Sequence, residues 1–166
     1  MSEISVRWIV KGDIERVSEI DRECFPKPWT GEDFSECLRQ KQNIGKVAEL
    51  DGKIVGFVLY ELCRKKIYLL NMGVKSSRRR IGVGRRLIDH LKQKLEKPEY
   101  WLSIETHVSE ENLSAHVFLR SMGFKAVSVE RGFFSDEDGL CDGYMFVFAN
   151  HSEAQEELIE SEEGAL

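Results

Sequence analysis

The chain of 166 residues contains no apolar run as long as the ~20 residues that a helix needs to cross a lipid bilayer. Its first residues, Met1 to Ile4, lack both the basic segment and the apolar segment of a secretory leader. These absences favour a soluble cytoplasmic protein with no membrane partner. The length fits one compact domain with a buried core and is too short for two domains of usual size.

Cysteine is scarce and scattered along the chain. The four cysteines include no Cys-x-x-Cys pair, and the four histidines do not cluster. Structural zinc sites are built from such closely spaced ligands, so the sequence predicts no metal site and reduced thiols. The four thiols are those of Cys24, Cys37, Cys63 and Cys141.

The net charge of −5 is distributed unevenly, because six glutamates lie in the last fourteen residues. Without them the chain carries a net charge near +1. The acidic segment has only Leu158 and Ile159 as sizeable apolar residues, too few to offset the entropy lost on ordering it. We therefore predict a folded domain over residues 1–150 and a disordered acidic tail over residues 151–166.

Hydrophobic periodicity and turn signals predict helices and strands in the order βααβββαβαββ. Asp51-Gly52 is the clearest hairpin turn, and Thr30 with Asp33 predicts a capped helix start. Strands joined both by hairpins and by helices imply a mixed sheet. The expected strands are 4–10, 47–50, 54–62, 67–74, 100–108, 125–130 and 144–149, and the expected helices are 14–24, 31–38, 83–95 and 112–122.

The most informative segment is a basic turn that leaves an apolar strand and opens an amphipathic helix. Gly82 and Gly84 let the backbone approach a ligand without interference from a Cβ atom. The first helical turn offers unpaired N–H groups and the positive end of the helix dipole, so we expect a ligand that carries phosphates. The P-loop pattern is absent, and Leu87 stands where a dinucleotide-binding turn would have a third glycine.

This turn resembles the pyrophosphate loop, Gln/Arg-x-x-Gly-x-Gly/Ala, of the GCN5-related N-acetyltransferase (GNAT) superfamily, with Arg79, Gly82 and Gly84 at the defining positions. The resemblance extends from about Val6 to Phe148, and the element order is that of the family. It implies an α/β (α+β) fold with a mixed, mostly antiparallel, twisted sheet of about seven strands and four helices. In that family the fourth and fifth strands splay apart to hold acetyl-CoA, so the resemblance implies acetyl-CoA as donor and no metal.

The same resemblance implies which residues hold the cofactor. The backbone amides of Met72 and Val74 would bond the acetyl carbonyl and pantetheine, and those from Arg80 to Arg85 would hold the pyrophosphate. Asn112 matches an asparagine that contacts the cofactor, although from the residues alone it is equally a simple helix N-cap. The implied cofactor-binding residues are Met72, Gly73, Val74, Arg79, Arg80, Ile81, Gly82, Val83, Gly84, Arg85 and Asn112.

Further motifs resemble the RimI-like branch, whose members acetylate protein N-termini. The run from Val108 through Asn112 to Ala115, followed by Gly123-Phe124, is similar to the pattern of that branch. Two aromatic loops match segments that flank the peptide-binding opening in the family. The implied acceptor-binding residues are Phe25, Pro26, Trp29, Phe133 and Phe134, with packing of these aromatics as the alternative.

The expected catalytic residues differ from those of RimI, whose glutamate base and tyrosine acid correspond to His107 and Leu119. In the eukaryotic branch that acetylates N-terminal methionine, the resemblance implies a histidine and tyrosine pair, here His107 and Tyr68. An imidazole of pKa about 6.5 can accept a proton from an α-amine, which titrates near pH 8, through a water that Tyr68 orients. Glu105, on the same strand face, could tune the imidazole or be the base itself.

The sequence therefore predicts transfer of acetyl from acetyl-CoA to the N-terminal α-amine of a protein or peptide, with a ribosomal protein as one candidate target. Direct attack in a ternary complex needs no covalent cysteine. Two alternatives stay open: a lysine or small-amine acetyltransferase on the same fold, and a non-catalytic acyl-CoA sensor, which Leu119 favours. No nucleic-acid partner is expected, since no aromatic platform accompanies the arginines. A monomer or weak dimer is expected.

Overall fold

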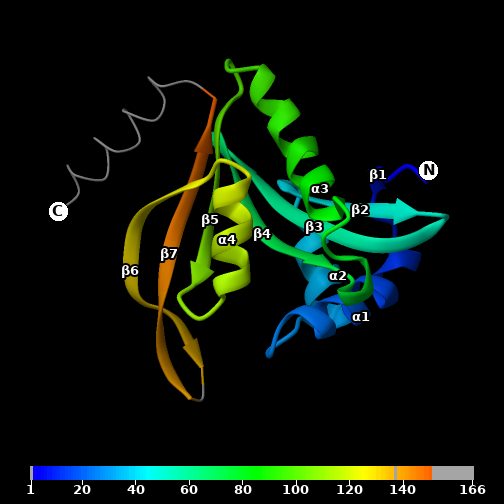
Figure 1. Cartoon of the computed structure of the whole chain (residues 1–166), viewed down its shortest axis with the longest axis horizontal. Coiled ribbons are helices and arrows are strands. Elements are labelled where there is room, and N and C mark those ends of the chain that lie inside the picture. The colour runs from blue at the N-terminus through cyan, green and yellow to red at the C-terminus, as the bar shows by residue number, and fades with distance from the viewer. Residues whose placement is uncertain (1, 137, 151–166) are drawn as a thin grey trace. The chain divides into compact units, whose positions relative to one another are not determined.

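The computed structural model describes residues 2–136 and 138–150, whose helices and strands are drawn in Figure 1. The predicted acidic tail, residues 151–166, lies outside the described residues. The chain divides into two compact units. Of the described residues, the first unit comprises 2–63 and 68–94, and the second comprises 64–67, 95–136 and 138–150.

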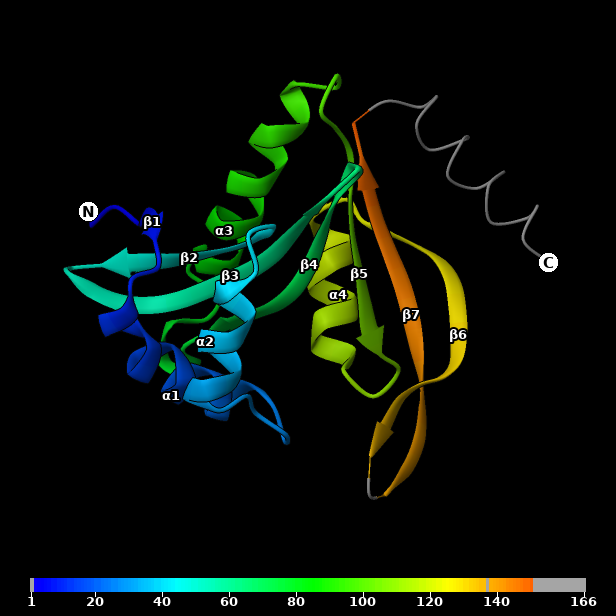
Figure 2. The same ribbon diagram turned by 180° about the vertical axis from the view of Figure 1, so that it is seen from behind.

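The first unit contains strands in the order β1-β2-β3-β4 and three α-helices. β1 pairs antiparallel with β2, and β2 pairs antiparallel with β3. Figure 2 shows α1 and α2 on one face of these strands and α3 on the other. The elements are β1 (Ser5–Trp8), α1 (Ile14–Cys24), α2 (Gly31–Arg39), β2 (Asn43–Leu50), β3 (Lys53–Cys63), β4 (Lys65–Val74, in this unit from Tyr68 onward) and α3 (Val83–Lys92), with 3-10 turns at Lys11–Asp13, Ser76–Arg78 and Gln93–Glu96.

The core of the first unit forms where α1 and α2 pack on the sheet. The Phe34 ring from α2 meets the Phe57 ring from β3 edge-on, with ring centroids 5.5 Å apart. On the other face, a side chain at Gly56 of β3 would collide with Val83 of α3, which shows how closely α3 lies on the strand. The fully buried cluster under α1 and α2 comprises Val17, Ile20, Phe34, Val47, Phe57 and Leu59.

Local signals in this unit act as the sequence predicts. The Thr30 hydroxyl accepts a hydrogen bond from the Asp33 N–H at 3.2 Å, and the Asp33 carboxylate accepts one from the Thr30 N–H at 2.7 Å. This reciprocal capping box satisfies two N–H groups that the start of α2 leaves unpaired. At the hairpin between β2 and β3, Asp51 and Gly52 both have positive φ, as the predicted turn requires.

The second unit contains β5 (Trp101–Ser109), α4 (Leu113–Ser121), β6 (Lys125–Asp136) and β7 (Gly139–Ala149). Its strand order is β5-β7-β6, and both neighbouring pairs are antiparallel. β7 therefore lies between the other two strands. A side chain on β5 can reach one on β6 only across β7.

The predicted fold class is confirmed, since residues 2–136 and 138–150 form seven strands and four α-helices in a mixed α/β arrangement. The splay implied for the fourth and fifth strands stays a prediction, because β5 and most of β4 belong to different units. None of the described helices is long and apolar enough to span a lipid bilayer. β2 begins at Asn43 rather than at residue 47. The alternation of apolar residues is interrupted at Gly45, where the absence of a side chain lets the strand lie close to Ile9 and Leu38.

The sequence predicts that Phe133 and Phe134 lie in a loop. This prediction is wrong, because residues 131–134 lie within β6. β6 and β7 continue as a hairpin in which Phe134 is opposite Cys141 and Ser135 is opposite Leu140. The register shifts between Glu130 and Phe134, where Gly132 has a φ of +64°. In sequence, the glycine and the charged residues of this segment suggest a loop. In the structure they form a bulge, and the two strands remain paired on both sides of it.

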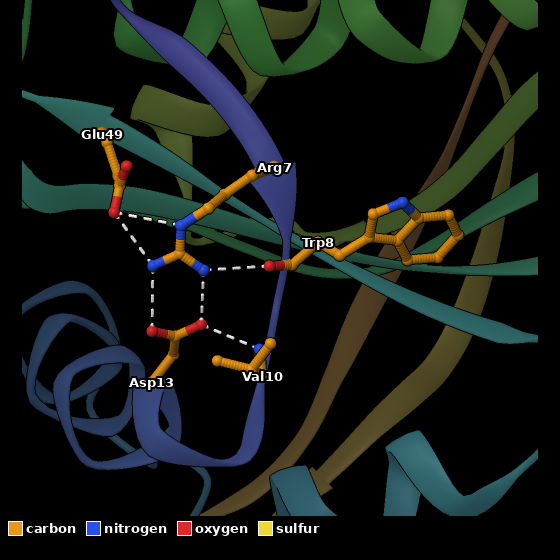
Figure 3. Close-up of polar contacts among 5 residues, drawn as sticks. All are labelled: Arg7, Trp8, Val10, Asp13 and Glu49. Carbon is orange, nitrogen blue, oxygen red and sulfur yellow. Dashed lines mark hydrogen bonds and ion pairs between the residues drawn. The ribbon is translucent and has the colours of Figure 1, made fainter.

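One charged cluster joins the start of the chain to the rest of the first unit (Figure 3). The Arg7 guanidinium donates to both Asp13 oxygens, at 2.8 and 3.0 Å, and to Glu49 at 2.9 and 3.0 Å. Asp13 also accepts the Val10 N–H at 2.8 Å. The hydrogen bonds from Arg7 are the main reason that the pKa of Asp13 lies below its usual value.

We predict that Asp13→Asn destabilises the protein at pH 7 by about 1–3 kcal/mol, since a nearly buried, charge-assisted hydrogen bond is lost. A lowered folded-state pKa means that Asp13 stabilises the fold above its unfolded value of about 3.9 and loses this effect as pH falls through the folded value. The deficit of the variant should therefore shrink below about pH 4. Urea unfolding of wild type and Asp13→Asn between pH 7 and pH 3 measures the difference in free energy of unfolding. A difference that does not change with pH would contradict the prediction.

Candidate active site

The glycine turn predicted to bind phosphates begins where β4 ends. Arg80 has a φ of +62° and Gly82, the N-cap of α3, has a φ of +96°. In α3 the Arg86 N–H donates to the Gly82 carbonyl at 3.0 Å. By helical geometry, the amides of residues 83 to 85 that precede it have no partner within the helix and point out of its N-terminal end.

The surroundings of Gly82 leave room for a ligand, since a Cβ atom built at this residue would have no atom within 4 Å. The turn is exposed and carries Arg78, Arg80 and Arg85. Free amides, the positive end of a ten-residue helix and flanking guanidinium groups are what a pyrophosphate requires. The residues present therefore fit a ligand with a diphosphate, as coenzyme A has.

Two predicted cofactor residues next to this turn have a structural role. The Arg79 side chain turns back, donating to the Val74 carbonyl at 3.1 Å and to the Cys24 sulfur at 3.3 Å. A Cβ atom at Gly73 would lie 2.7 Å from the Phe57 ring, so the core requires glycine there. Neither finding tests the backbone contacts predicted for residues 72 to 74.

In the second unit, His107 on β5 is held from two sides. Its Nε2 atom lies 3.0 Å from a Glu130 carboxylate oxygen on β6, and its ring stacks on Phe133 with centroids 4.0 Å apart and planes 10° apart. The His107 side chain is 10% exposed and that of Glu130 is 50% exposed. Because a carboxylate accepts hydrogen bonds, Nε2 of the neutral ring carries the proton and Nδ1 is its basic nitrogen.

Gly143 on β7 makes this arrangement possible. It is opposite Glu130 on β6 and opposite Ser109 on β5, so it lies between the two outer strands. A Cβ atom at Gly143 would be 2.8 Å from the Cβ of Phe133. The missing side chain leaves space for Phe133 to lie across β7 against His107.

A family model described as the acetyltransferase (GNAT) family matches residues 14–124. The chain belongs to the GNAT acetyltransferase family. This match includes β4, the glycine turn, His107 and α4, and the protein is accordingly an acyltransferase.

Similar proteins of known name come from bacteria and eukaryotes. N-alpha-acetyltransferase 60 of Danio rerio is 25% identical over 89% of this chain and 70% of its own length. The [ribosomal protein bS18]-alanine N-acetyltransferase of Escherichia coli K12 is 24% identical over 80% of this chain and 88% of its own.

Two solved structures share the fold of this GNAT protein. The ribosomal-protein-S18-alanine N-acetyltransferase of Escherichia coli has a TM-score of 0.77 at 21% identity, covering 89% of this chain and 94% of its own. Arabidopsis thaliana NAA60 in complex with acetyl-CoA also has a TM-score of 0.77, at 22% identity, covering 89% of this chain and 100% of its own.

Of the other predicted catalytic groups of this GNAT protein, one belongs to the second unit and one to the first. Glu105 is on β5 with His107 but is 2% exposed, and its carboxylate accepts from Lys66 at 3.1 Å and from Ser103 at 3.4 Å. Tyr68 lies on β4 in the first unit. The pairing of Tyr68 with His107 and the choice between His107 and Glu105 as base stay predictions.

Asn112 caps α4, since its side-chain oxygen accepts hydrogen bonds from the Ala115 N–H at 3.3 Å and the Ser114 hydroxyl at 3.2 Å. A contact with cofactor is compatible with this cap and stays a prediction.

The predicted acceptor-binding aromatics both pack and face solvent. The Trp29 ring lies 5.2 Å from that of Phe34, and it also lines a shallow groove of about 310 Å³ with Asp33, Glu36 and Cys37. Phe133 is 43% exposed although it stacks on His107, and Phe134 meets it edge-on at 4.9 Å. Packing and acceptor binding therefore do not exclude one another at these residues. Phe25 and Pro26 lie between α1 and Trp29 in the same loop.

Sequence reasoning missed Glu130 as a partner of His107. The two residues are on strands that are not neighbours, so no pairing rule applied to adjacent strands would join them. The usable signal is Gly143, since a glycine inside a strand marks close approach of another group.

We predict that Gly82→Ala lowers the free energy of unfolding by about 1 kcal/mol although nothing would touch the new methyl group, because alanine disfavours positive φ. Gly12→Ala is the matched control, since a Cβ atom there also has no atom within 4 Å and Gly12 is not among the residues with positive φ. Urea unfolding of both variants separates the conformational cost from steric crowding. Equal stability of the two variants would contradict the prediction.

Proposed function

We propose that this acetyltransferase transfers acetyl from acetyl-CoA to the N-terminal α-amine of a protein or peptide. The observation that supports acetyl-CoA as the donor is the open glycine turn at the start of α3, where Gly82 and the amides after it can receive a diphosphate. An N-terminal α-amine as the acceptor is supported by relatives named as N-alpha-acetyltransferase and alanine N-acetyltransferase. A cytoplasmic location is part of the proposal.

Acetyl-CoA would supply an acetyl group activated as a thioester. The amides of residues 80 to 85 and the nearby arginines would hold its diphosphate, and the amides of Met72 and Val74 would hold pantetheine and the acetyl carbonyl. Binding at these points fixes the carbonyl carbon for attack and places N–H donors where negative charge develops on its oxygen.

His107 would take the proton that the acceptor ammonium must lose before it attacks. An α-amine titrates near pH 8 and is largely protonated at neutral pH. Glu130 holds one ring nitrogen of His107, and the imidazole would accept the proton directly or through a water that Tyr68 orients. Attack forms the C–N bond and breaks the C–S bond. The thiolate needs little help in leaving because a thiol has a pKa of about 8.5, which accommodates Leu119.

A cationic acceptor segment would suit the groove beside Trp29, which presents Asp33 and Glu36 to solvent. Glu32, another acidic group of α2, is 3.6 Å from Arg39 and is partly neutralised by it. Basic N-terminal segments, such as those of ribosomal proteins, would match this charge.

The proposal is tested by acetyl transfer to a peptide library varied at its first two residues, with peptides blocked at the N-terminus but containing lysine, and small amines, as controls. We expect acetyl on unblocked α-amines only, with higher kcat/KM for peptides with lysine or arginine after the first residues. Transfer to lysine or small amines alone would contradict it. Tight binding of CoA without any transfer would instead identify the acyl-CoA sensor.

We predict that His107→Gln lowers kcat by about 10² to 10⁴-fold, the range for loss of a general base, without changing the affinity for CoA. Glu130→Gln should lower kcat about tenfold, since the ring loses an ionic hydrogen bond but keeps a neutral one. His90→Gln on α3 is the matched control and should leave kcat within about twofold.

Rates at pH 6 to 9 for these variants and for Glu105→Gln identify the base. If His107→Gln kept the wild-type rate and pH profile while Glu105→Gln lost them, Glu105 would be the base instead.

A further inference from the structure

A carboxylate that the proposed mechanism does not use lies at the centre of the first unit. Asp21, near the end of α1, is 0% exposed. Its two oxygens bond to different segments: Oδ1 accepts from the Asn71 side chain on β4 at 3.0 Å, and Oδ2 accepts from the Trp29 N–H at 2.7 Å. Both donors are neutral, and burial raises the pKa of Asp21.

Asp21 also holds both ends of the loop that carries the predicted acceptor-binding residues. Its backbone carbonyl accepts the Phe25 N–H at 3.1 Å where the loop leaves α1, and its side chain accepts the Trp29 N–H where the loop reaches α2. The loop between them contains Pro26 and Pro28, which have no N–H to donate. Asp21 thus fixes this loop at its two termini.

The third bond of Asp21 leads to the donor strand. Asn71 directly precedes Met72, Gly73 and Val74, the segment of β4 proposed to hold pantetheine and the acetyl carbonyl. A shift of Asn71 along the strand would therefore shift these amides. One side chain connects the backbone of Trp29 to this strand.

Stability alone does not account for a carboxylate at this place. Burying a charge without a cationic partner is costly, and α1 and α2 are already held by the apolar cluster around Phe34 and Phe57. What the carboxylate adds is two acceptor atoms at fixed positions, which an apolar side chain of the same volume would not supply.

We propose that Asp21 is a positioning residue that fixes the Trp29 loop relative to β4, and so sets the alignment of the acceptor with the acetyl donor. This inference rests on the proposed function. It assigns Asp21 no contact with substrate, and it predicts effects on acceptor use that exceed its effect on stability.

The test compares Asp21→Ala, Asp21→Leu and Asp21→Asn. Alanine and leucine remove both acceptors, and leucine keeps most of the volume. Asparagine can still accept from the Trp29 N–H with its amide oxygen, and its NH₂ group can donate to Asn71 once the Asn71 amide turns over. Asp13→Asn is the matched control, because Asp13 is also a buried, hydrogen-bonded carboxylate of this unit but lies in the Arg7 cluster (Figure 3).

Steady-state kinetics with an N-terminal peptide and acetyl-CoA, well below the unfolding temperature of each variant, give the first readout. We expect Asp21→Ala and Asp21→Leu to raise the peptide KM about tenfold, with a smaller change in CoA affinity, because the glycine turn is not altered. Asp21→Asn should recover the wild-type KM to within about threefold, and Asp13→Asn should leave it unchanged. An unchanged KM in the alanine and leucine variants, or no recovery with asparagine, would overturn the proposal.

Amide hydrogen exchange at Trp29 gives a second readout that does not depend on activity. Asp21→Leu should speed exchange at this amide about tenfold or more relative to core amides of β3, and Asp21→Asn should not. If wild type transfers no acetyl to peptides but the exchange result holds, the proposed function fails while the positioning role stands. If exchange at Trp29 is unchanged in Asp21→Leu, the positioning role fails whatever the enzyme acetylates.

Discussion

The exclusion of a side chain at Gly73 is the constraint on which the first unit depends. The Phe57 ring occupies the space that a Cβ atom at position 73 would need, and the same ring meets Phe34, whose ring in turn lies against Trp29. The strand proposed to hold the donor and the loop proposed to hold the acceptor are thus supported by one run of aromatic contacts. A larger residue at position 73 would displace both the strand and the loop, since a packed core transmits strain.

Glycines of two kinds occur in this protein, and the sequence does not separate them. Gly82 has open space around it and a positive φ, so glycine is needed there for the backbone conformation and for access of a ligand. Gly73 and Gly143 are crowded by phenylalanine side chains, so glycine is needed there because a Cβ atom would not fit. All three stand near predicted site residues. Only the three-dimensional surroundings show which of them leaves room for a ligand and which leaves room for a neighbouring side chain.

Features set by local sequence were predictable, and features set by distant contacts were not. Helical periodicity, the Thr30 capping box and the Asp51-Gly52 turn act within a few residues, and all three appear as predicted. The hydrogen bond between Asp21 and Asn71 joins residues fifty positions apart, and that between His107 and Glu130 crosses a third strand. The length of the β6 and β7 hairpin was underestimated because its bulge at Gly132 has the composition of a loop.

The contact between His107 and Glu130 joins a nearly buried ring to a carboxylate that is half in water. An imidazole can gain a proton on one nitrogen and give up another from the opposite nitrogen, which leaves the ring neutral with its tautomer exchanged. In the proposed reaction, a proton taken up by His107 would then pass to Glu130 and on to solvent. The pair would form a short proton path that returns the ring to its neutral state between turnovers.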